Sequence, residues 1–197
     1  FLPFDGLPTV IPALLNLGLS GVPYVTHDIA GYSGGPSTKD LWMRWTELGA
    51  FTPVMRTHEG LKALLNWRWN SDAETLAHFR RFANLHMALG PTFEALAAEA
   101  AATSVPPMRH LVLEFPDDPN VVGISDELML GSDLLVAPVV NEAETSREVY
   151  LPAGTWYHAL RAGESYVGPG TFTIAAPLGE PPVFWRDADR TLLRDVP

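Results

Sequence analysis

Two segments of the chain end in residue types that could do chemistry. The first, 21–32, carries Asp28, and the second, 49–60, carries Arg56 and His58. Each is a short apolar run that ends in charged residues and opens into a glycine-containing loop, as a buried parallel strand does at its carboxyl end. Arg56 and His58 lie two positions apart, so a strand presents them on one face. A carboxylate that accepts from hydroxyls, beside Arg and His donors, predicts a site for a polyhydroxylated ligand.

The same residues allow two other interpretations. Charged side chains are rarely buried without a partner, so Asp28 and Arg56 could form a buried ion pair that only braces the two strands. His27, Asp28, His58 and Glu59 could instead supply imidazole and carboxylate ligands to a metal. Against a metal, the segments lack His-x-His and His-Glu-x-x-His spacings. They also hold only two histidines, and a catalytic zinc usually needs three protein ligands.

Tryptophan side chains flank this predicted site. Aromatic faces stack on sugar rings, although tryptophan more often belongs to a core. Trp45 lies on the apolar stripe of a predicted helix together with Leu41 and Leu48, so we assign it to the core. Trp67 and Trp69 lie in a predicted loop near the charged residues, and either could form a wall of a substrate pocket.

The first hundred residues predict the alternating helices and strands that would position these side chains. An almost uniformly apolar stretch predicts a helix buried all round over 7–19. Ser37 or Thr38 can cap a second helix that extends to about Leu48. The strand candidates are 21–26 and 51–55. Further helices are predicted from a capping box at 71–74 to about residue 89, and over 92–103.

The residue pattern changes after Pro106 and Pro107, where short apolar runs alternate with turn residues. Runs of this length and spacing are typical of an antiparallel β-sandwich. We place the boundary between the two regions near Ser104, and we expect the acidic pairs at 117–118 and 126–127 to be solvated turn residues. The apolar runs are 108–115, 128–130, 134–140, 148–151, 155–158, 171–175 and 183–185.

Composition narrows the possible partners. Among 197 residues, 23 are acidic and 13 basic, for a formal net charge of −10. Without a Lys- or Arg-rich run, neither nucleic acid nor an anionic membrane is an expected partner. The chain has no cysteine for disulfides or thiolate metal sites, and no apolar run long enough to span a bilayer. It begins at Phe1 in mid-pattern, so we expect a fragment or a processed product. Compartment and oligomeric state are not indicated.

Several longer motifs resemble glycoside hydrolase family 31, whose members are retaining α-glycosidases such as α-glucosidases, α-xylosidases and sulfoquinovosidases. The resemblance begins with Gly-Val-Pro-Tyr-x-x-His-Asp-Ile-x-Gly-Tyr at 21–32. It continues through Arg44-Trp45 and Gly-Ala-Phe-x-Pro-x-x-Arg-x-His at 49–58. It then extends through 108–109, 113–118, 129–139 and 149–157, and so covers nearly the whole chain. One departure is Ala30, where family members commonly have Gly.

The resemblance implies an α/β region followed by an all-β region. Residues 1–104 would form the C-terminal portion of a (β/α)8 catalytic barrel, with 21–28 and 51–58 as its seventh and eighth strands. Residues 105–197 would form the antiparallel β-sandwich that follows the barrel in this family, its proximal C-terminal domain.

The resemblance also implies a mechanism and the residues that serve it. The family uses double displacement, in which one aspartate forms a glycosyl-enzyme and a second acts as acid and then base. Both match positions upstream of Phe1, so we expect no catalytic residue in this chain and no activity from the chain alone. Asp5 is an alternative acid/base, but it matches the Asp-Gly-Leu that follows that residue in the family.

Four residues match positions that line the sugar subsite at the cleaved bond: Asp28, Tyr32, Arg56 and His58. The implied partner is a carbohydrate substrate, with no metal and no cofactor. Whether that substrate is a glucoside, a xyloside or a sulfoquinovoside stays open. The alternatives are a non-catalytic carbohydrate-binding or scaffold protein and, with a metal at the charged cluster, a metal-dependent barrel hydrolase.

Overall fold

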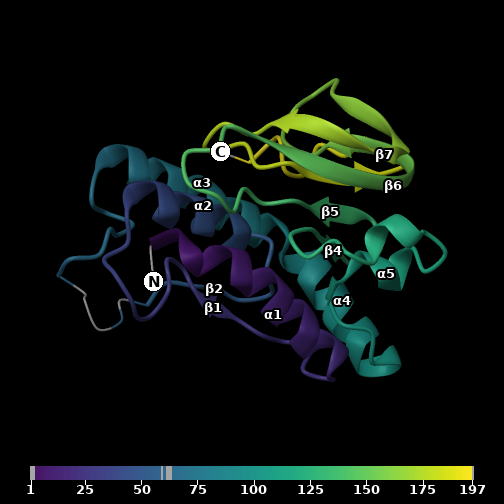
Figure 1. Cartoon of the computed structure of the whole chain (residues 1–197), viewed down its shortest axis with the longest axis horizontal. Coiled ribbons are helices and arrows are strands. Elements are labelled where there is room, and N and C mark those ends of the chain that lie inside the picture. Colours follow the sequence, from purple (N-terminus) through teal and green to yellow (C-terminus); the bar gives the residue numbers. More distant parts are fainter. Residues whose placement is uncertain (1–2, 59, 61–63, 197) are drawn as a thin grey trace.

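A computed structural model describes residues 3–58, 60 and 64–196 of the chain. It consists of a helical region that carries a short parallel strand pair, followed by an antiparallel sheet (Figure 1). The helices are α1 (Leu7–Leu19), α2 (Lys39–Gly49), α3 (Ala73–Ala88), α4 (Gly90–Thr103) and α5 (Leu111–Glu114), with 3-10 turns η1 (Pro3–Asp5) and η2 (Pro119–Val121). The parallel strands are β1 (His27–Asp28) and β2 (Met55–Arg56).

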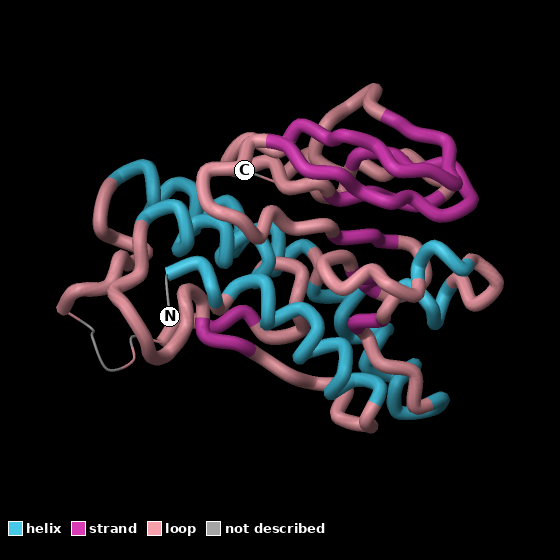
Figure 2. The backbone as a smooth tube through the Cα atoms, viewed as in Figure 1, coloured by secondary structure: helices cyan, strands magenta, loops and turns pink. Residues whose placement is uncertain are grey.

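The antiparallel sheet has the order β3-β4-β5-β8-β6-β7. Its long hairpin of β6 and β7 folds over the layer that contains β4 and β5, and the large helices lie on the other side of that layer (Figure 2). The strands are β3 (Met108–Arg109), β4 (Leu128–Leu130), β5 (Leu134–Val136), β6 (Ser146–His158), β7 (Ser165–Ala175) and β8 (Val183–Arg186).

The layer of β4, β5 and β8 is buried on both faces. Because alternate residues of a strand point to opposite faces, Met129 and Leu135 enter the core beneath the β6–β7 hairpin. Leu128, Leu134 and Trp185 enter the other core, which they share with the helices. This double burial explains why β4 and β5 are apolar at every position, whereas the outer strand β7 alternates.

The helix predictions are confirmed in position, but α1 is not buried all round. Leu7, Ile11 and Leu14 face the core, whereas Leu17 and Leu19 are 42% and 52% exposed. At that end Gly18 faces Pro106 and Met108, whereas the side chains of Leu17 and Leu19 point into solvent. The uniformly apolar composition therefore overstated the burial of this helix.

The strands of the first region lie further along the chain than the sequence predicted. Among the described residues of this region, strand pairing is found at His27–Asp28 and Met55–Arg56, at or just beyond the C-terminal ends of the predicted runs. Pro23 and Pro53 have no N–H to donate to a ladder, so they disfavour pairing in the earlier part of each run. Apolar side chains next to the strands, such as Val22 and Tyr24, are consequently half exposed.

The predicted capping box at the start of α3 is replaced by a different cap. Asp72, not Ser71, is the N-cap, and its Oδ1 accepts from the backbone N of Thr75 at 2.7 Å. Glu74 reaches Lys39 instead of turning back to the cap, with Oε2 at 2.5 Å from Nζ. Ser71 Oγ accepts from the backbone N of Arg68, which tightens the turn before the helix.

Two predictions for the second region were wrong. The run 108–115 is not one strand, because His110 N-caps the short helix α5 by accepting from the N of Val112 through Nδ1 at 3.1 Å. The pair 126–127 is not solvated throughout, since Glu127 is 2% exposed. Its Oε1 accepts from the N of Tyr150 at 2.9 Å, and burial raises the pKa of Glu127 to about 7.

A buried ionic cluster, which we call the junction network, joins the helices to the loop before β8. It consists of Arg44 and Glu47 of α2 and His78 of α3, all at most 6% exposed. Glu47 accepts from Arg44 Nη1 at 3.0 Å and from the backbone N of Gly179 at 2.6 Å, and lies 3.2 Å from His78 Nε2. Arg44 Nη2 also donates to the carbonyl of Ala176 at 2.9 Å. The network therefore fixes α2 and α3 against the sheet region.

Candidate functional site

The parallel pairing of β1 and β2 brings the predicted charged residues together. The register places Asp28 opposite Arg56, and Arg56 Nε lies 2.9 Å from Asp28 Oδ1. The ladder continues one step further, where the N of Ile29 donates to the carbonyl of Arg56 at 3.0 Å. The side chain of Arg56 is 47% exposed and that of Asp28 is 18% exposed. The pair therefore stands open at the edge of the sheet in this chain, which favours a binding role over the buried brace considered as an alternative.

Tyr32 and His58 form the second contact of the site. Their ring centroids lie 5.0 Å apart at an interplanar angle of 52°. Tyr32 is 50% exposed, so the contact does not bury its ring. A Cβ on Gly60 would lie only 1.6 Å from the carbonyl oxygen of Tyr32, so glycine is required for this close approach. The structure thus places Asp28 with Arg56 and Tyr32 with His58 on neighbouring loops.

The turn between Asp28 and Tyr32 explains why family members commonly have Gly at the position of Ala30. The N of Gly31 donates to the carbonyl of Asp28 at 2.8 Å, and φ is +66° at Ala30 and +80° at Gly31. A left-handed backbone favours glycine because a Cβ there crowds the following carbonyl, at a cost of roughly 1–2 kcal/mol. The preference for glycine at this position is therefore a backbone requirement, which Ala30 meets under strain.

His27 points away from the charged pair, toward helix α2. Trp45 Nε1 donates to His27 Nδ1 at 2.8 Å, and Thr52 Oγ1 lies 3.5 Å from Nε2. Burial lowers the pKa of His27 to about 4, against a smaller opposing effect of Asp28, so the ring is neutral near pH 7. Trp45 is 5% exposed, which confirms its assignment to the core.

This geometry does not favour the metal alternative. The donation from Trp45 occupies Nδ1 of His27, and Arg56 occupies one oxygen of Asp28. Glu59, the fourth candidate ligand, lies outside the described residues. Among the residues that the structure describes, no three His, Cys, Asp or Glu side chains gather in a way that could hold a metal ion.

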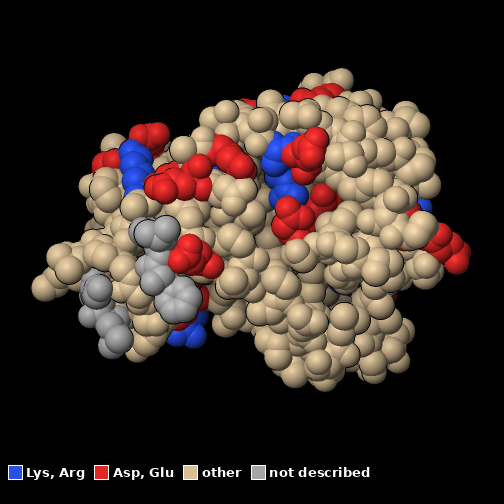
Figure 3. All heavy atoms as spheres, in the orientation of Figure 1, with Lys and Arg blue, Asp and Glu red and all other residues tan. Residues whose placement is uncertain are grey.

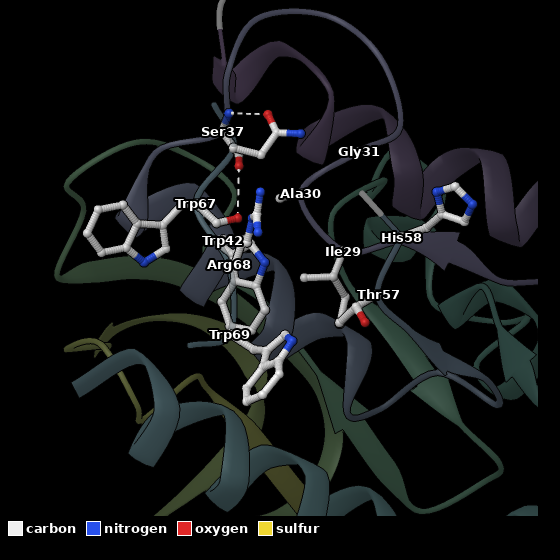
Figure 4. A pocket seen from close by; sticks show the side chains of 11 residues that line it. Ile29, Ala30, Gly31, Ser37, Trp42, Thr57, His58, Trp67, Arg68 and Trp69 are labelled. Atoms are coloured by element: carbon white, nitrogen blue, oxygen red, sulfur yellow. Dashed lines mark hydrogen bonds between the residues drawn. The ribbon is translucent and has the colours of Figure 1, made fainter. Parts of the chain in front are cut away.

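A small pocket of about 60 Å³ opens next to His58. Trp67 and Trp69 lie on one side of it, and Thr57 and His58 lie on the other (Figure 4). The indole of Trp67 has a structural role, because its Nε1 donates a hydrogen bond to Thr75 Oγ1 at 2.9 Å. Trp69 is 43% exposed and keeps a face available to a ligand.

The sequence did not indicate several residues of this pocket. Ser37, expected only as a possible helix cap, donates its backbone N to Asn66 Oδ1 at 3.2 Å and its hydroxyl to the carbonyl of Trp67 at 3.4 Å. These contacts join segments thirty residues apart, so no local pattern predicts them. The residues that line the pocket are Ile29, Ala30, Gly31, Ser37, Trp42, Thr57, His58, Asn66, Trp67, Arg68 and Trp69.

Charged side chains of both signs are mixed on one face of the molecule (Figure 3). On the face shown in Figure 3, Lys and Arg side chains lie beside Asp and Glu and form no separate basic patch. No helix among the described residues is long and apolar enough to cross a membrane.

Comparisons with known proteins place this geometry in a family. The family model of the glycosyl hydrolases family 31 TIM-barrel domain matches residues 3–96, and that of the family 31 C-terminal domain matches residues 104–188. A sulfoquinovosidase of Agrobacterium fabrum is 45% identical over 92% of this chain and 28% of its own length. A sulfoquinovosidase of Escherichia coli is 41% identical over 92% of this chain and 27% of its own length.

Solved structures agree with these matches. A family 31 sulfoquinovosidase from E. rectale, in complex with an aza-sugar inhibitor, has a TM-score of 0.89. It is 34% identical, and the match covers 97% of this chain and 30% of that one. A family 31 dextranase of Flavobacterium johnsoniae, complexed with glucose, has a TM-score of 0.87 and 33% identity over 93% of this chain and 23% of that one.

The chain thus spans less than a third of the length of these two curated relatives. The predicted fold class, the C-terminal portion of a (β/α)8 barrel followed by an antiparallel β-sandwich, is confirmed. The chain belongs to glycoside hydrolase family 31.

Proposed function

We propose that this chain supplies one edge of the sugar-binding site of a retaining α-glycosidase. The observation that supports it best is the parallel pairing of β1 and β2. It brings Asp28 within 2.9 Å of Arg56 and leads into the contact between Tyr32 and His58. Active sites of (β/α)8 barrels lie at the carboxyl ends of the strands, which is where these four residues lie.

In this proposal Asp28 binds substrate and does not carry out the chemistry. Arg56 engages Oδ1 of Asp28, and Oδ2 has no hydrogen-bond partner among the described residues, so it is available to a sugar hydroxyl. His58 can donate to a second hydroxyl, and its ring packs against Tyr32. Trp69 is the better candidate for a substrate wall, because the indole N–H of Trp67 is already bonded.

We propose that the nucleophile and the acid/base of double displacement come from barrel strands other than β1 and β2. A retaining mechanism needs two carboxyl groups about 5–5.5 Å apart on either side of the cleaved bond. Asp28, the carboxylate that the described residues place beside Arg56 at this edge, is already engaged by that arginine. Its role is to hold the sugar ring so that the two catalytic groups meet the anomeric carbon.

Sulfoquinovosides are the first substrates to test, because the relatives at 45% and 41% identity are named sulfoquinovosidases. A sulfonate needs a cationic or strongly donating partner. Arg56 is paired with Asp28, so in this proposal the sulfonate would be recognised by groups other than Arg56. Neutral α-glucosides are the second class to test, since a structural neighbour is a dextranase.

The proposal can be tested with the full-length enzyme and a panel of aryl α-glycosides. We expect hydrolysis with the α-anomer as first product by NMR, and no effect of a chelator. His58→Ala should lower kcat/KM roughly 10- to 100-fold, the value of a hydrogen bond of about 1.5–3 kcal/mol. His86→Ala is the matched control, because His86 lies on α3, where its Nδ1 is 3.2 Å from the carbonyl of Ala50 and its ring packs against Phe93. Inversion, or loss of activity with the chelator, would contradict the proposal.

A further inference from the structure

A second, larger pocket lies in the sheet region, where the proposed function assigns nothing. The loop from Glu114 to Asn120 forms one wall, and Tyr150 and Ala153 of β6 with Pro169 of β7 form the other. Its volume is about 420 Å³, against about 60 Å³ for the pocket beside His58. The value lies within the range of about 300–1,000 Å³ typical of small-molecule sites. The two pockets share no lining residue.

The polar side of this second pocket is held in place before any ligand arrives. Tyr150 Oη donates to Asp118 Oδ2 at 2.6 Å, and Asn120 Nδ2 donates to Asp118 Oδ1 at 2.8 Å. Asp118 also caps η2 by accepting from the N of Asn120 at 3.0 Å. The hydrogen bond from Tyr150 is the main cause of a lowered pKa of Asp118. These three side chains therefore form a fixed scaffold and lose little freedom on binding.

Two hydrogen-bond acceptors at the pocket remain unused. The carboxylate of Asp117 and Oδ1 of Asn120 have no hydrogen-bond partner among the residues that the structure describes. The same loop adds the apolar side chains of Phe115 and Pro116, and Pro169 adds another from the other wall. Acceptors beside an apolar wall suit a ligand that has hydroxyl donors on its rim and C–H groups on its face, as a hexose does.

Charge limits which hexoses would fit. The lining contains Glu114, Asp117 and Asp118 and no Lys, Arg or His. Glu114 is paired with Arg109 at 2.6 Å, but Asp117 has no cationic partner among the described residues. An anionic ligand would face uncompensated repulsion here. The pocket therefore selects against sulfonated and phosphorylated sugars, unlike an active site that accepts a sulfoquinovoside.

We infer that this pocket, at the loop 114–120 and β6–β7, is a second saccharide-binding site for a neutral hexose unit. It would hold a glucan or oligosaccharide to the sheet region while the barrel site acts on a chain end.

The test is an equilibrium titration of the full-length protein with isomaltose, which gives the number of isomaltose molecules bound per protein and their affinity. The double variant Asp117→Ala/Asn120→Ala removes both free acceptors, and Ala153→Trp fills the pocket from an exposed position. Glu142→Ala, a surface carboxylate outside the lining, is the matched control. Hydrolysis of a small aryl α-glycoside reports separately on the barrel site.

Both pocket variants should bind one isomaltose fewer than the parent, or bind it at least about tenfold more weakly, as expected for a lost hydrogen bond to a charged group. Their kcat/KM on the aryl glycoside and the binding by Glu142→Ala should be unchanged, and glucose 6-phosphate should not compete for the site. Isomaltose binding that is the same in both pocket variants as in the parent would overturn the inference, as would competition by glucose 6-phosphate.

Discussion

Two acid–arginine pairs in this chain have the same chemistry and opposite surroundings. In the junction network, Arg44 and Glu47 are 2% and 0% exposed, 3.0 Å apart, and hydrogen-bonded to the backbone of the sheet region. At the barrel edge, Arg56 and Asp28 are 47% and 18% exposed, 2.9 Å apart, and carried by two-residue strands. The distance within each pair is nearly the same, so distance alone does not distinguish their roles.

The difference in burial indicates which of the two pairs has a structural role and which can bind a ligand. The groups of the first pair are directed to partners inside the protein, and removing one of them would leave a buried charge uncompensated. An exposed pair contributes little to stability because water and salt screen it. Its groups can therefore exchange water for a ligand at low cost. Charge at the barrel edge is thus available for sugar hydroxyls, whereas charge in the junction network fixes the two regions to each other.

The largest effect is expected from Glu47→Gln. The change keeps the shape of the side chain but removes the buried carboxylate that Arg44 Nη1 contacts at 3.0 Å. The carboxylate of Asp40, 3.9 Å from Nε, is too far to replace it, so the loss should cost about 3–5 kcal/mol. Urea unfolding of the full-length protein measures it. Glu74→Gln, which breaks an exposed pair with Lys39, is the matched control and should cost less than about 1 kcal/mol. Equal losses in the two variants would show that burial does not decide the roles of these pairs.

Glu127 provides the case of a buried acid in which a nearby cation, Arg147 with Nη2 at 3.7 Å, does not offset the effect of burial. Its pKa is raised from 4.5 to about 7 by burial, so the folded state holds the proton more tightly than the unfolded state does. Its contribution to stability is therefore complete below pH 4.5 and is lost as the pH rises through 7.

Glu127→Gln should match the parent near pH 4.5 and exceed its stability at pH 8 by up to about 3 kcal/mol, from about 1.36 kcal/mol per pKa unit. Unfolding curves at both pH values decide this. The exposed neighbour Glu148, changed to Gln, should keep the pH dependence of the parent. A Glu127→Gln variant with the same dependence would mean that the buried carboxyl does not titrate in this range.

A smaller loss of stability is expected from Trp45→Phe, because Trp45 connects the junction network to the barrel edge. Trp45 lies on the helix that carries the junction network, and its N–H is bonded to His27, next to Asp28. Loss of the donor leaves Nδ1 of His27 unsatisfied and should cost about 1–3 kcal/mol. Trp69→Phe, at an exposed ring, should change stability by less than about 0.5 kcal/mol. The opposite order of the two effects would contradict the account of His27.

Local patterns predicted much of this fold. Helix positions followed from apolar periodicity and caps, and the sandwich strands β4 and β8 fall where the apolar runs 128–130 and 183–185 indicated. The strand ends of the first region were misplaced because their pairing depends on a partner segment and on where Pro23 and Pro53 withhold a donor. Glu127 was misjudged because an acidic pair in a turn gives no sign of which member turns inward.

The site was predictable in its residue types but not in its partners. The charged ends of the two runs indicated Asp28, Arg56 and His58, and the parallel register brings the first two together. The junction network could not be predicted, since Glu47 and Gly179 are 132 residues apart in sequence. The resemblance to the family, rather than any local pattern, is what indicated Tyr32 as the fourth subsite residue.

The most direct measurement is a comparison of Asp28→Asn and Glu47→Gln in the full-length enzyme, with kcat/KM and the free energy of unfolding determined for both. Asp28→Asn should lower kcat/KM at least about tenfold, the value of one hydrogen bond to a charged group. It should change stability by less than about 1 kcal/mol, because its ion pair is open to solvent. Glu47→Gln should reduce stability strongly and leave kcat/KM of the folded enzyme close to the parent value. If Asp28→Asn unfolds the protein, or retains full activity, the pair at the barrel edge is a brace and not a binding group.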